Sequence, residues 1–150
     1  MHDLVVIGLT SPLLVGVYED GRLIETIESE EKTSEILPSI CEELMQRYEF
    51  AHLLYAKGPG SFMAIKVGYI FLKTLSIAKN IPLLATDAFY FNENTPIKAV
   101  GKLCFVKIGE EITTQVFNEV PLNRFRLPER LELEDFDRDT APYYGIGAVG

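Results

Sequence analysis

The sequence predicts an α/β fold in which helices cover a mixed five-stranded β-sheet. Three strand-like runs open the chain, and an Asp-Gly turn joins the second run to the third. Farther along, residues 53–85 have the pattern strand, tight turn, helix and strand, which is typical of a crossover between parallel strands. The composition, 47% hydrophobic and 24% charged over 150 residues, is that of an ordinary folded protein.

The first three strands are predicted at residues 3–9, 13–18 and 23–28. Asp20-Gly21, between the second and third runs, is a strong hairpin signal. The third run alternates apolar and polar residues, so one of its sides should face solvent. We therefore expect three consecutive antiparallel strands.

A helix is predicted to start at Thr33 or Ser34, either of which can serve as its N-cap, and to end near residue 48. Its apolar side chains cover roughly half of the helix circumference, which is more than one sheet face usually needs. Ile40, Leu44 and Met45 are therefore expected to extend beyond the area that the sheet covers.

The unit at residues 53–85 organises the rest of the chain. A short apolar strand leads into the turn Gly58-Pro59-Gly60-Ser61, and a helix at residues 62–79 and a strand at residues 81–85 follow. The helix is apolar on almost every side, and only Lys66 and Lys73 form a clear polar stripe. Such a helix needs burial on two sides, whereas a small domain provides only one.

The polar residues 92–96 are the candidate boundary between two lobes, which divides the chain into residues 1–96 and residues 97–150. Just before this boundary, Asp87 can cap one further helical turn.

The second lobe is predicted to be reduced. It should contain one β-hairpin with strands at residues 101–108 and 112–118. Residues 119–150 contain three prolines and an acidic run, and we expect irregular structure there, with one short strand near residues 131–133.

The order of the predicted elements in the first lobe is three antiparallel strands, helix, strand, helix and strand. This order is that of a ribonuclease-H-like or actin-like half-domain, in which helices cover a mixed five-stranded sheet. The predicted class is therefore the actin/Hsp70/sugar-kinase-like fold with a reduced C-terminal lobe.

The charge balance argues against a protein that attracts nucleic acid by itself, because the formal net charge is −8 and the sequence pI is about 4.8. A partner would have to supply the basic surface. Cys41 and Cys104 are expected to be buried free thiols, with a disulfide between them as the less favoured alternative. No basic segment of the signal-peptide kind opens the sequence, and lysines interrupt the apolar stretch 62–85 too often for a membrane span. We expect a cytoplasmic protein that does not bind membranes.

Metal and nucleophile chemistry has little support in the sequence. His2 and His52 are the only histidines, and they are far apart. Ser61 follows a strand and opens a helix, but its surroundings do not match the Gly-x-Ser-x-Gly nucleophile motif. Gly8 stands near the end of the first strand, where a fold of this class normally carries an acid.

At the glycine turn, phosphate binding has more support than nucleophilic catalysis but less than a purely conformational role. Gly58, Gly60 and Ser61 would offer backbone N–H groups at the positive end of a helix dipole. The alternative is that the glycines only allow the chain to turn sharply. The Walker pattern is absent, so the turn is not a P-loop.

Residues 56–68, AKGPGSFMAIKVG, resemble the signature GRGPGSFTGLRIG of the bacterial TsaB (YeaZ) family. The resemblance covers about residues 4–90 and includes the helix start TSEILP at residues 33–38. Met63, Ala64 and Lys66 replace the Thr, Gly and Arg of the family signature, and Gly8 replaces the usual Asp.

TsaB proteins are inactive relatives of TsaD in the Gcp-like, or M22 glycoprotease-like, superfamily. They bind TsaD and, with TsaE, support formation of N6-threonylcarbamoyladenosine (t6A) at position 37 of tRNAs that read ANN codons. The resemblance implies a non-catalytic scaffold that binds a TsaD-like paralogue and works with a TsaE-like ATPase. It implies no cofactor on this chain, with ATP and metal on the partner or at a shared interface, and contact with tRNA only through the complex.

The resemblance and the apolar helices together predict the partner interface. Ala64 and Gly68 are four residues apart and would permit close approach of another helix, and Phe71 and Leu75 continue that side. Ile40, Leu44 and Met45 of the first helix would complete the interface.

Two alternatives remain. One is an enzyme, either a nucleotide-binding actin-like ATPase or an M22-type metallopeptidase, which would need the missing acid and histidines. The other is a homodimeric interaction protein with a different role.

Overall fold

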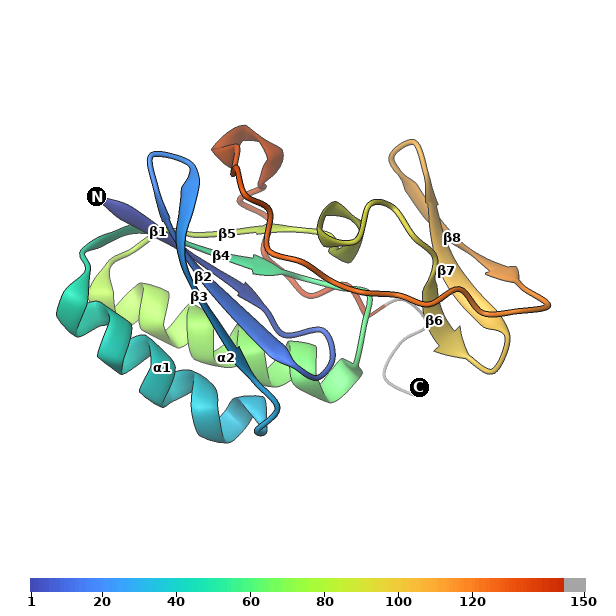
Figure 1. Ribbon diagram of the computed structural model, residues 1–150, viewed down its shortest axis with the longest axis horizontal. Coiled ribbons are helices and arrows are strands. Elements are labelled where there is room, and N and C mark those ends of the chain that lie inside the picture. Colours follow the sequence, from blue (N-terminus) through green and yellow to red (C-terminus); the bar gives the residue numbers. More distant parts are fainter. Residues whose placement is uncertain (145–150) are drawn as a thin grey trace.

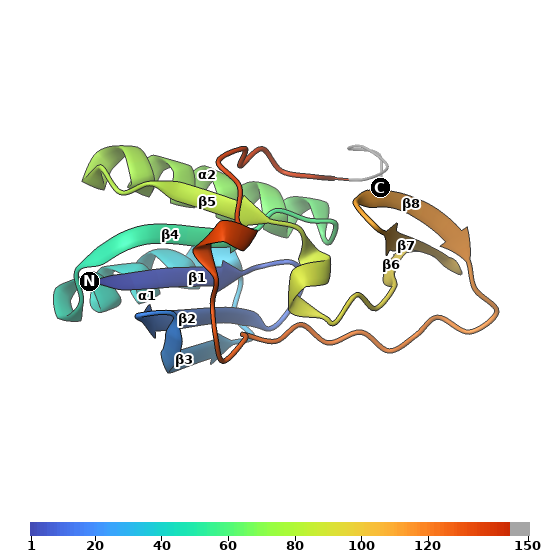
Figure 2. The ribbon, with the colours of Figure 1, turned by 90° about the horizontal axis from the view of Figure 1, so that it is seen from above.

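The computed structural model describes residues 1–144, which form two lobes (Figure 1). The larger lobe contains a mixed five-stranded sheet in the order β3-β2-β1-β4-β5, which Figure 2 shows from above. Neighbouring β1, β2 and β3 are antiparallel, whereas β4 pairs in parallel with both β1 and β5. The strands are β1 (His2–Ile7), β2 (Leu13–Glu19), β3 (Arg22–Ser29), β4 (Phe50–Ala56) and β5 (Leu83–Thr86). The predicted sheet and its helices are confirmed.

Two helices, α1 (Thr33–Arg47) and α2 (Phe62–Lys79), cover one face of this sheet (Figure 1). Each helix directs one apolar stripe into the core, because residues three and four apart share a face. From α1 the fully or nearly buried residues are Leu37, Ile40, Cys41 and Leu44, and from α2 they are Ile65, Gly68 and Leu72. Cys41 and Cys104 are both buried and unbonded, as expected.

The smaller lobe is a three-stranded antiparallel sheet in the order β6-β7-β8, with β6 (Ile97–Val100), β7 (Leu103–Ile108) and β8 (Glu111–Val116). The short 3-10 helix η1 (Ala88–Phe91) leads into it. The predicted hairpin is present as β7 and β8. The sequence did not predict β6, because a run of four residues with one lysine gives too short an alternation to be recognised.

The largest departure from the prediction is the segment 126–144, which we call the strap. It leaves the smaller lobe and crosses the strands of the large sheet on the face opposite the helices (Figure 2). Its backbone pairs with both edge strands, through a bridge from Arg130 to Arg22 of β3 and a bridge from Asp137 to Ala85 of β5. The strand expected near residues 131–133 is absent, and the 3-10 helix η2 (Leu133–Asp135) follows Leu131 instead.

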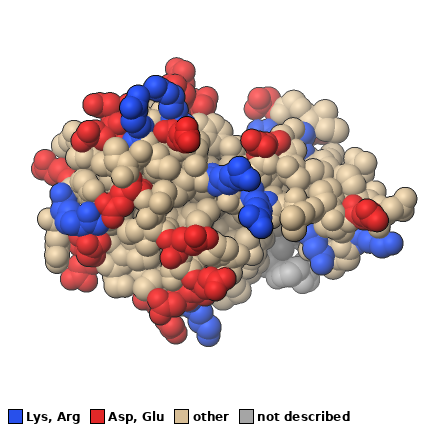
Figure 3. Space-filling model, viewed as in Figure 1, with Lys and Arg blue, Asp and Glu red and all other residues tan. Residues whose placement is uncertain are grey.

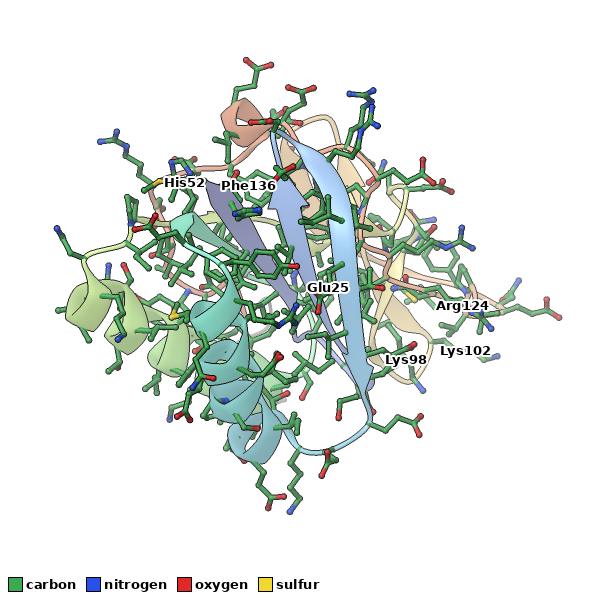
Figure 4. The ribbon with its side chains drawn as sticks, turned by 60° about the vertical axis from the view of Figure 1, so that its left-hand side comes forward. Glu25, His52, Lys98, Lys102, Arg124 and Phe136 are labelled. Carbon is green, nitrogen blue, oxygen red and sulfur yellow. The ribbon has the colours of Figure 1, made fainter. Side chains whose placement is uncertain are left out.

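The strap is anchored by buried side chains and by two tyrosines of the sheet. Leu131 and Phe136 are 4% and 8% exposed, and Figure 4 shows Phe136 above the strands, away from α1. The Tyr18 hydroxyl donates to the carbonyl oxygen of Pro128 at 2.5 Å, and the Tyr55 hydroxyl donates to that of Thr140. Burial raises the pKa of both tyrosines, so they remain donors at any physiological pH.

These contacts change the predicted division of the chain. The sequence assigned residues 97–150 to one reduced lobe. In the structure, residues 97–116 form the small sheet, whereas the strap packs on the sheet of the first lobe and completes its second layer. The lobe boundary therefore does not separate two independent stretches of chain.

An ion pair outside the core connects β3 to α1. Glu25 accepts two hydrogen bonds from Arg47, at 2.9 and 2.6 Å, and one from the Tyr48 hydroxyl at 2.7 Å (Figure 4 labels Glu25). These donors, Arg47 first, lower the pKa of Glu25 from 4.5 to about 2.

Because the folded-state pKa is the lower one, this carboxylate stabilises the fold above pH 4.5, and that contribution is lost as the pH falls toward 2. In the Glu25→Gln variant, the free energy of unfolding is therefore expected to fall less steeply below pH 4.5 than in the wild type. Urea unfolding at a series of pH values measures this slope. Glu42→Gln, at an exposed position of α1 without a hydrogen-bond partner among residues 1–144, is the control and should leave the slope unchanged. Equal slopes for the two variants would contradict the assignment.

Within residues 1–144, no helix is both long enough and apolar enough to cross a membrane.

Candidate partner-binding face and the glycine turn

The outer face of α2 carries large apolar side chains that no other segment of residues 1–144 covers. Met63, Ile70 and Ile77 are 60%, 54% and 72% exposed and are spaced seven residues apart. Val67 and Thr74 lie between them, so the five residues follow alternating steps of four and three. This is the spacing of a seam that packs against a second helix. We call these five residues the α2 seam.

The residues that flank the α2 seam indicate which charge a partner helix should carry. Lys66 and Lys73 lie one position before Val67 and Thr74 and are exposed. Ala64 and Phe71, each one position after a seam residue, are partly buried. In paired helices such flanking positions carry the charges that select a partner. The face therefore suits a helix with an apolar stripe and acidic residues beside it.

The predicted need of α2 for burial on two sides matches what the structure shows. Ile65 and Leu72 are 2% and 0% exposed on the inner face, and the α2 seam lies on the outer face. The seven-residue spacing of Met63, Ile70 and Ile77 was visible in the sequence and was the signal that would have identified them as candidates.

Two of the predicted interface residues are not available to a partner. Ile40 and Leu44 are 8% and 0% exposed and belong to the core between α1 and the sheet. The expectation that they extend beyond the sheet is wrong, because α2 packs beside α1 and the two helices together enclose these side chains. Met45 and Leu75 are partly buried and pack against the same core.

Gly68 lies on the inner part of α2, but no atom would lie within 4 Å of a Cβ added there. The helix backbone is therefore open at this position, as the predicted close approach of another helix requires. Ala64, Gly68, Phe71 and Leu75 remain predicted contacts at the margin of the α2 seam.

The glycine turn is packed between two other segments of the chain. A Cβ on Gly58, whose φ is +119°, would lie 2.0 Å from the carbonyl oxygen of Tyr143. A Cβ on Gly60 would lie 2.9 Å from the carbonyl oxygen of Leu9. The Ser61 N–H donates to that same oxygen at 2.8 Å. These contacts support the alternative in which the glycines allow backbone segments to approach closely, rather than a phosphate site at Gly58, Gly60 and Ser61.

Substitutions at two glycines distinguish the tightly packed turn from the open position on α2. Gly58→Ala is expected to destabilise the protein by at least about 2 kcal/mol, because alanine is strained at positive φ and its Cβ would meet the strap. Gly68→Ala is expected to stabilise it by about 0.5–1 kcal/mol, because the site is helical and has space. Urea unfolding of both variants measures this difference. A Gly58→Ala variant as stable as the wild type would show that the strap does not rest on the turn.

The polar residues singled out in the sequence have structural partners. Asp87 caps η1 by accepting from the Phe89 N–H at 2.9 Å, as predicted, and it pairs with Lys107 at 2.6 Å. His52 contacts Asp3 at 2.8 Å, on the side of the sheet where β1 and β4 begin. In residues 1–144, no group of three or more His, Cys, Asp or Glu residues is placed to hold a metal ion.

The mixed sheet, its two helices and its crossover order define an α/β protein of the actin-like, ribonuclease-H-like class. Residues 27–90 match the family model of TsaD, described as tRNA N6-adenosine threonylcarbamoyltransferase. The chain is similar in structure to YeaZ from Pseudomonas aeruginosa, with a TM-score of 0.54 and 16% sequence identity over 87% of this chain and 69% of that chain. These findings confirm the predicted resemblance to the TsaB (YeaZ) family.

A second solved structure gives the same result. An uncharacterized protein with similarity to peptidase YeaZ, also from Pseudomonas aeruginosa, superposes with a TM-score of 0.55 at 16% identity. It covers 87% of this chain and 68% of that chain. No curated protein sequence matches the chain.

Proposed function

We propose that this protein is a non-catalytic subunit that binds a TsaD-type partner through the α2 seam and supports t6A modification of tRNAs that read ANN codons. The exposed α2 seam is the observation that carries the proposal. The match of residues 27–90 to the TsaD family model and the YeaZ-like fold supply the biological context.

The energetics favour a role in binding. Three apolar side chains on one face of α2 are more than half exposed. Covering them with a partner is favourable by about 25 cal/mol for each Å² of apolar surface removed from water. Apolar side chains clustered at the centre of a surface, with charged groups at its rim, are the usual arrangement of a protein interface.

The glycine turn supports a scaffold role in a different way. The carbonyl oxygen of Tyr143 lies against the Cα of Gly58, and the Tyr143 N–H donates to the Lys57 carbonyl oxygen at 2.7 Å, so the turn serves to pack the strap. In this proposal, any nucleotide and metal ion that the reaction needs are held by the partner or at a shared interface.

The test is co-expression with a TsaD-type protein, followed by size-exclusion chromatography with light scattering and by calorimetric titration. We expect a heterodimer, and we expect t6A formation on tRNA, measured by mass spectrometry of nucleosides, to require both proteins and a TsaE-like ATPase. Separate elution of the two proteins, together with t6A formation that is unchanged when this chain is omitted, would refute the proposal.

A homodimer through the same seam is the second candidate, because any seam of this kind can pair with its own copy. In an antiparallel pair, Lys66 and Lys73 of both copies would lie along one edge and repel each other, which favours an acidic partner. Light scattering of the isolated chain as a function of concentration measures this competition. Titration of the isolated chain with ATP tests the alternative of a nucleotide-binding actin-like ATPase.

A further inference from the structure

Basic residues are concentrated in one part of an otherwise acidic protein. Residues 97–126 contain five Lys or Arg and three Asp or Glu, whereas the rest of the chain contains nine basic and nineteen acidic residues. This segment comprises the small sheet and the connection that leads from it to the strap.

The two ends of the small sheet carry side chains of opposite charge. In an antiparallel meander, successive turns lie at opposite ends of the sheet. Lys102 is in the turn between β6 and β7, and Lys98 is in β6, four residues earlier. Glu110 and Glu111 lie at the turn between β7 and β8, at the other end. One end of the small sheet is therefore basic and the other is acidic.

The chain leaves the small sheet at its basic end, since the Phe117 N–H donates to the Lys102 carbonyl oxygen at 2.9 Å. It then continues through an extended segment in which exposure alternates, so that Arg124 and Arg126 are both directed outward. Figure 4 shows Lys98, Lys102 and Arg124 on the side of the molecule away from α1 and α2. We call Lys98, Lys102, Arg124 and Arg126 the basic edge.

No residue of the basic edge has an ion-pair partner among residues 1–144, and all four are exposed. By contrast, Lys107 in the same sheet is paired with Asp87. Figure 3 shows Lys and Arg side chains on the lower edge of the smaller lobe, while acidic side chains predominate on the visible face of the larger lobe. The basic edge is thus available to an external anion.

We propose that the basic edge contacts the phosphodiester backbone of the tRNA that the complex modifies. The proposal rests on the proposed function for the identity of the RNA. The four cations are spread along a strand, a turn and an extended segment, which suits a continuous polyanion and not a single small anion. Because the basic edge and the α2 seam lie on different elements, one molecule can use both at once.

Nearby glutamates determine which residues of the basic edge should be substituted in a test. Glu28 and Glu30 line a cavity of about 480 Å³ together with Arg124 and Arg126, so the charge of the two arginines is partly offset. Lys98 and Lys102 do not line this cavity. The test therefore substitutes these two lysines.

The experiment compares Lys98→Gln/Lys102→Gln with the control Lys32→Gln/Arg138→Gln, which removes two exposed charges elsewhere. Fluorescence anisotropy with labelled tRNA is measured over a range of salt concentrations, first with the complex. For the basic-edge variant we expect a dissociation constant about five- to tenfold higher and a salt slope lower by about 1.5, since each lost phosphate contact removes about 0.7–0.9. The control should match the wild type.

A second arm uses the isolated chain with tRNA at low salt, so that the result does not depend on the partner. Failure of the wild-type complex to form refutes the proposed function alone, because the isolated chain still tests the basic edge. Equal tRNA affinity and salt slope for the wild type and the basic-edge variant in either arm would overturn the inference. Loss of partner binding by this variant would also overturn it, since the basic edge would then be a protein contact.

Discussion

Replacing Ile70 with glutamate is expected to abolish binding of the TsaD-type partner while leaving the protein folded. Ile70 is the central residue of the α2 seam, 54% exposed in the isolated chain and covered in the proposed complex. A carboxylate at the centre of an apolar interface loses its hydration without gaining a partner. We expect a loss of at least about 3 kcal/mol in binding, or more than about 100-fold in the dissociation constant.

Calorimetric titration with the partner measures this loss, and thermal unfolding of the isolated variant reports on its fold. Ile108→Glu is the matched control, because Ile108 is also an exposed isoleucine, 69% accessible, and lies at the end of β7 in the small lobe. The control should bind like the wild type. An Ile70→Glu variant that also retains wild-type affinity would exclude the α2 seam as the interface.

Replacing Phe136 with alanine is expected to give the largest loss of stability, about 3–4 kcal/mol. The ring is 8% exposed and packs against Tyr90 and Phe91, with centroid separations of 5.3 and 6.3 Å. Its removal leaves a cavity between the strap and the sheet, and it weakens the bridge between Asp137 and Ala85. For a chain of this length, the loss should lower the midpoint of thermal unfolding by about 10 °C.

Leu133→Ala is the control for this prediction. Leu133 is in the strap three residues from Phe136, but it is 37% exposed and should cost less than about 1 kcal/mol. Urea unfolding of the two variants gives the comparison. If both variants lost the same small amount of unfolding free energy, the strap would be a surface segment and not the second layer of the sheet.

The first lobe could be predicted from the sequence because its signals are local. The Asp20-Gly21 turn, the apolar periodicity of α2 and the glycine turn each specify structure within a few residues, and their order specifies the sheet. The glycine signature also led to the correct family resemblance, although 16% identity gives little other sequence signal.

The strap could not be predicted, because its structure is imposed by distant residues. Leu131 and Phe136 stand in an acidic run without helix or strand periodicity, and only contact with the sheet orders them. The burial of Ile40 and Leu44 was missed for a related reason. How much of α1 is covered depends on where α2 lies, and periodicity within α1 contains no information on that position.

The strap also has a consequence for the order of folding. The hydrogen bond from Tyr18 to Pro128 joins residues 110 positions apart, so the face of the sheet opposite the helices closes only after nearly the whole chain has been ordered. Contacts over such distances form late, because the entropy of closing a long loop is lost before the contact stabilises anything. A fragment that ends at the lobe boundary would contain every strand and helix of the first lobe but expose an apolar sheet face to water. We therefore expect the two lobes to fold together as one cooperative unit.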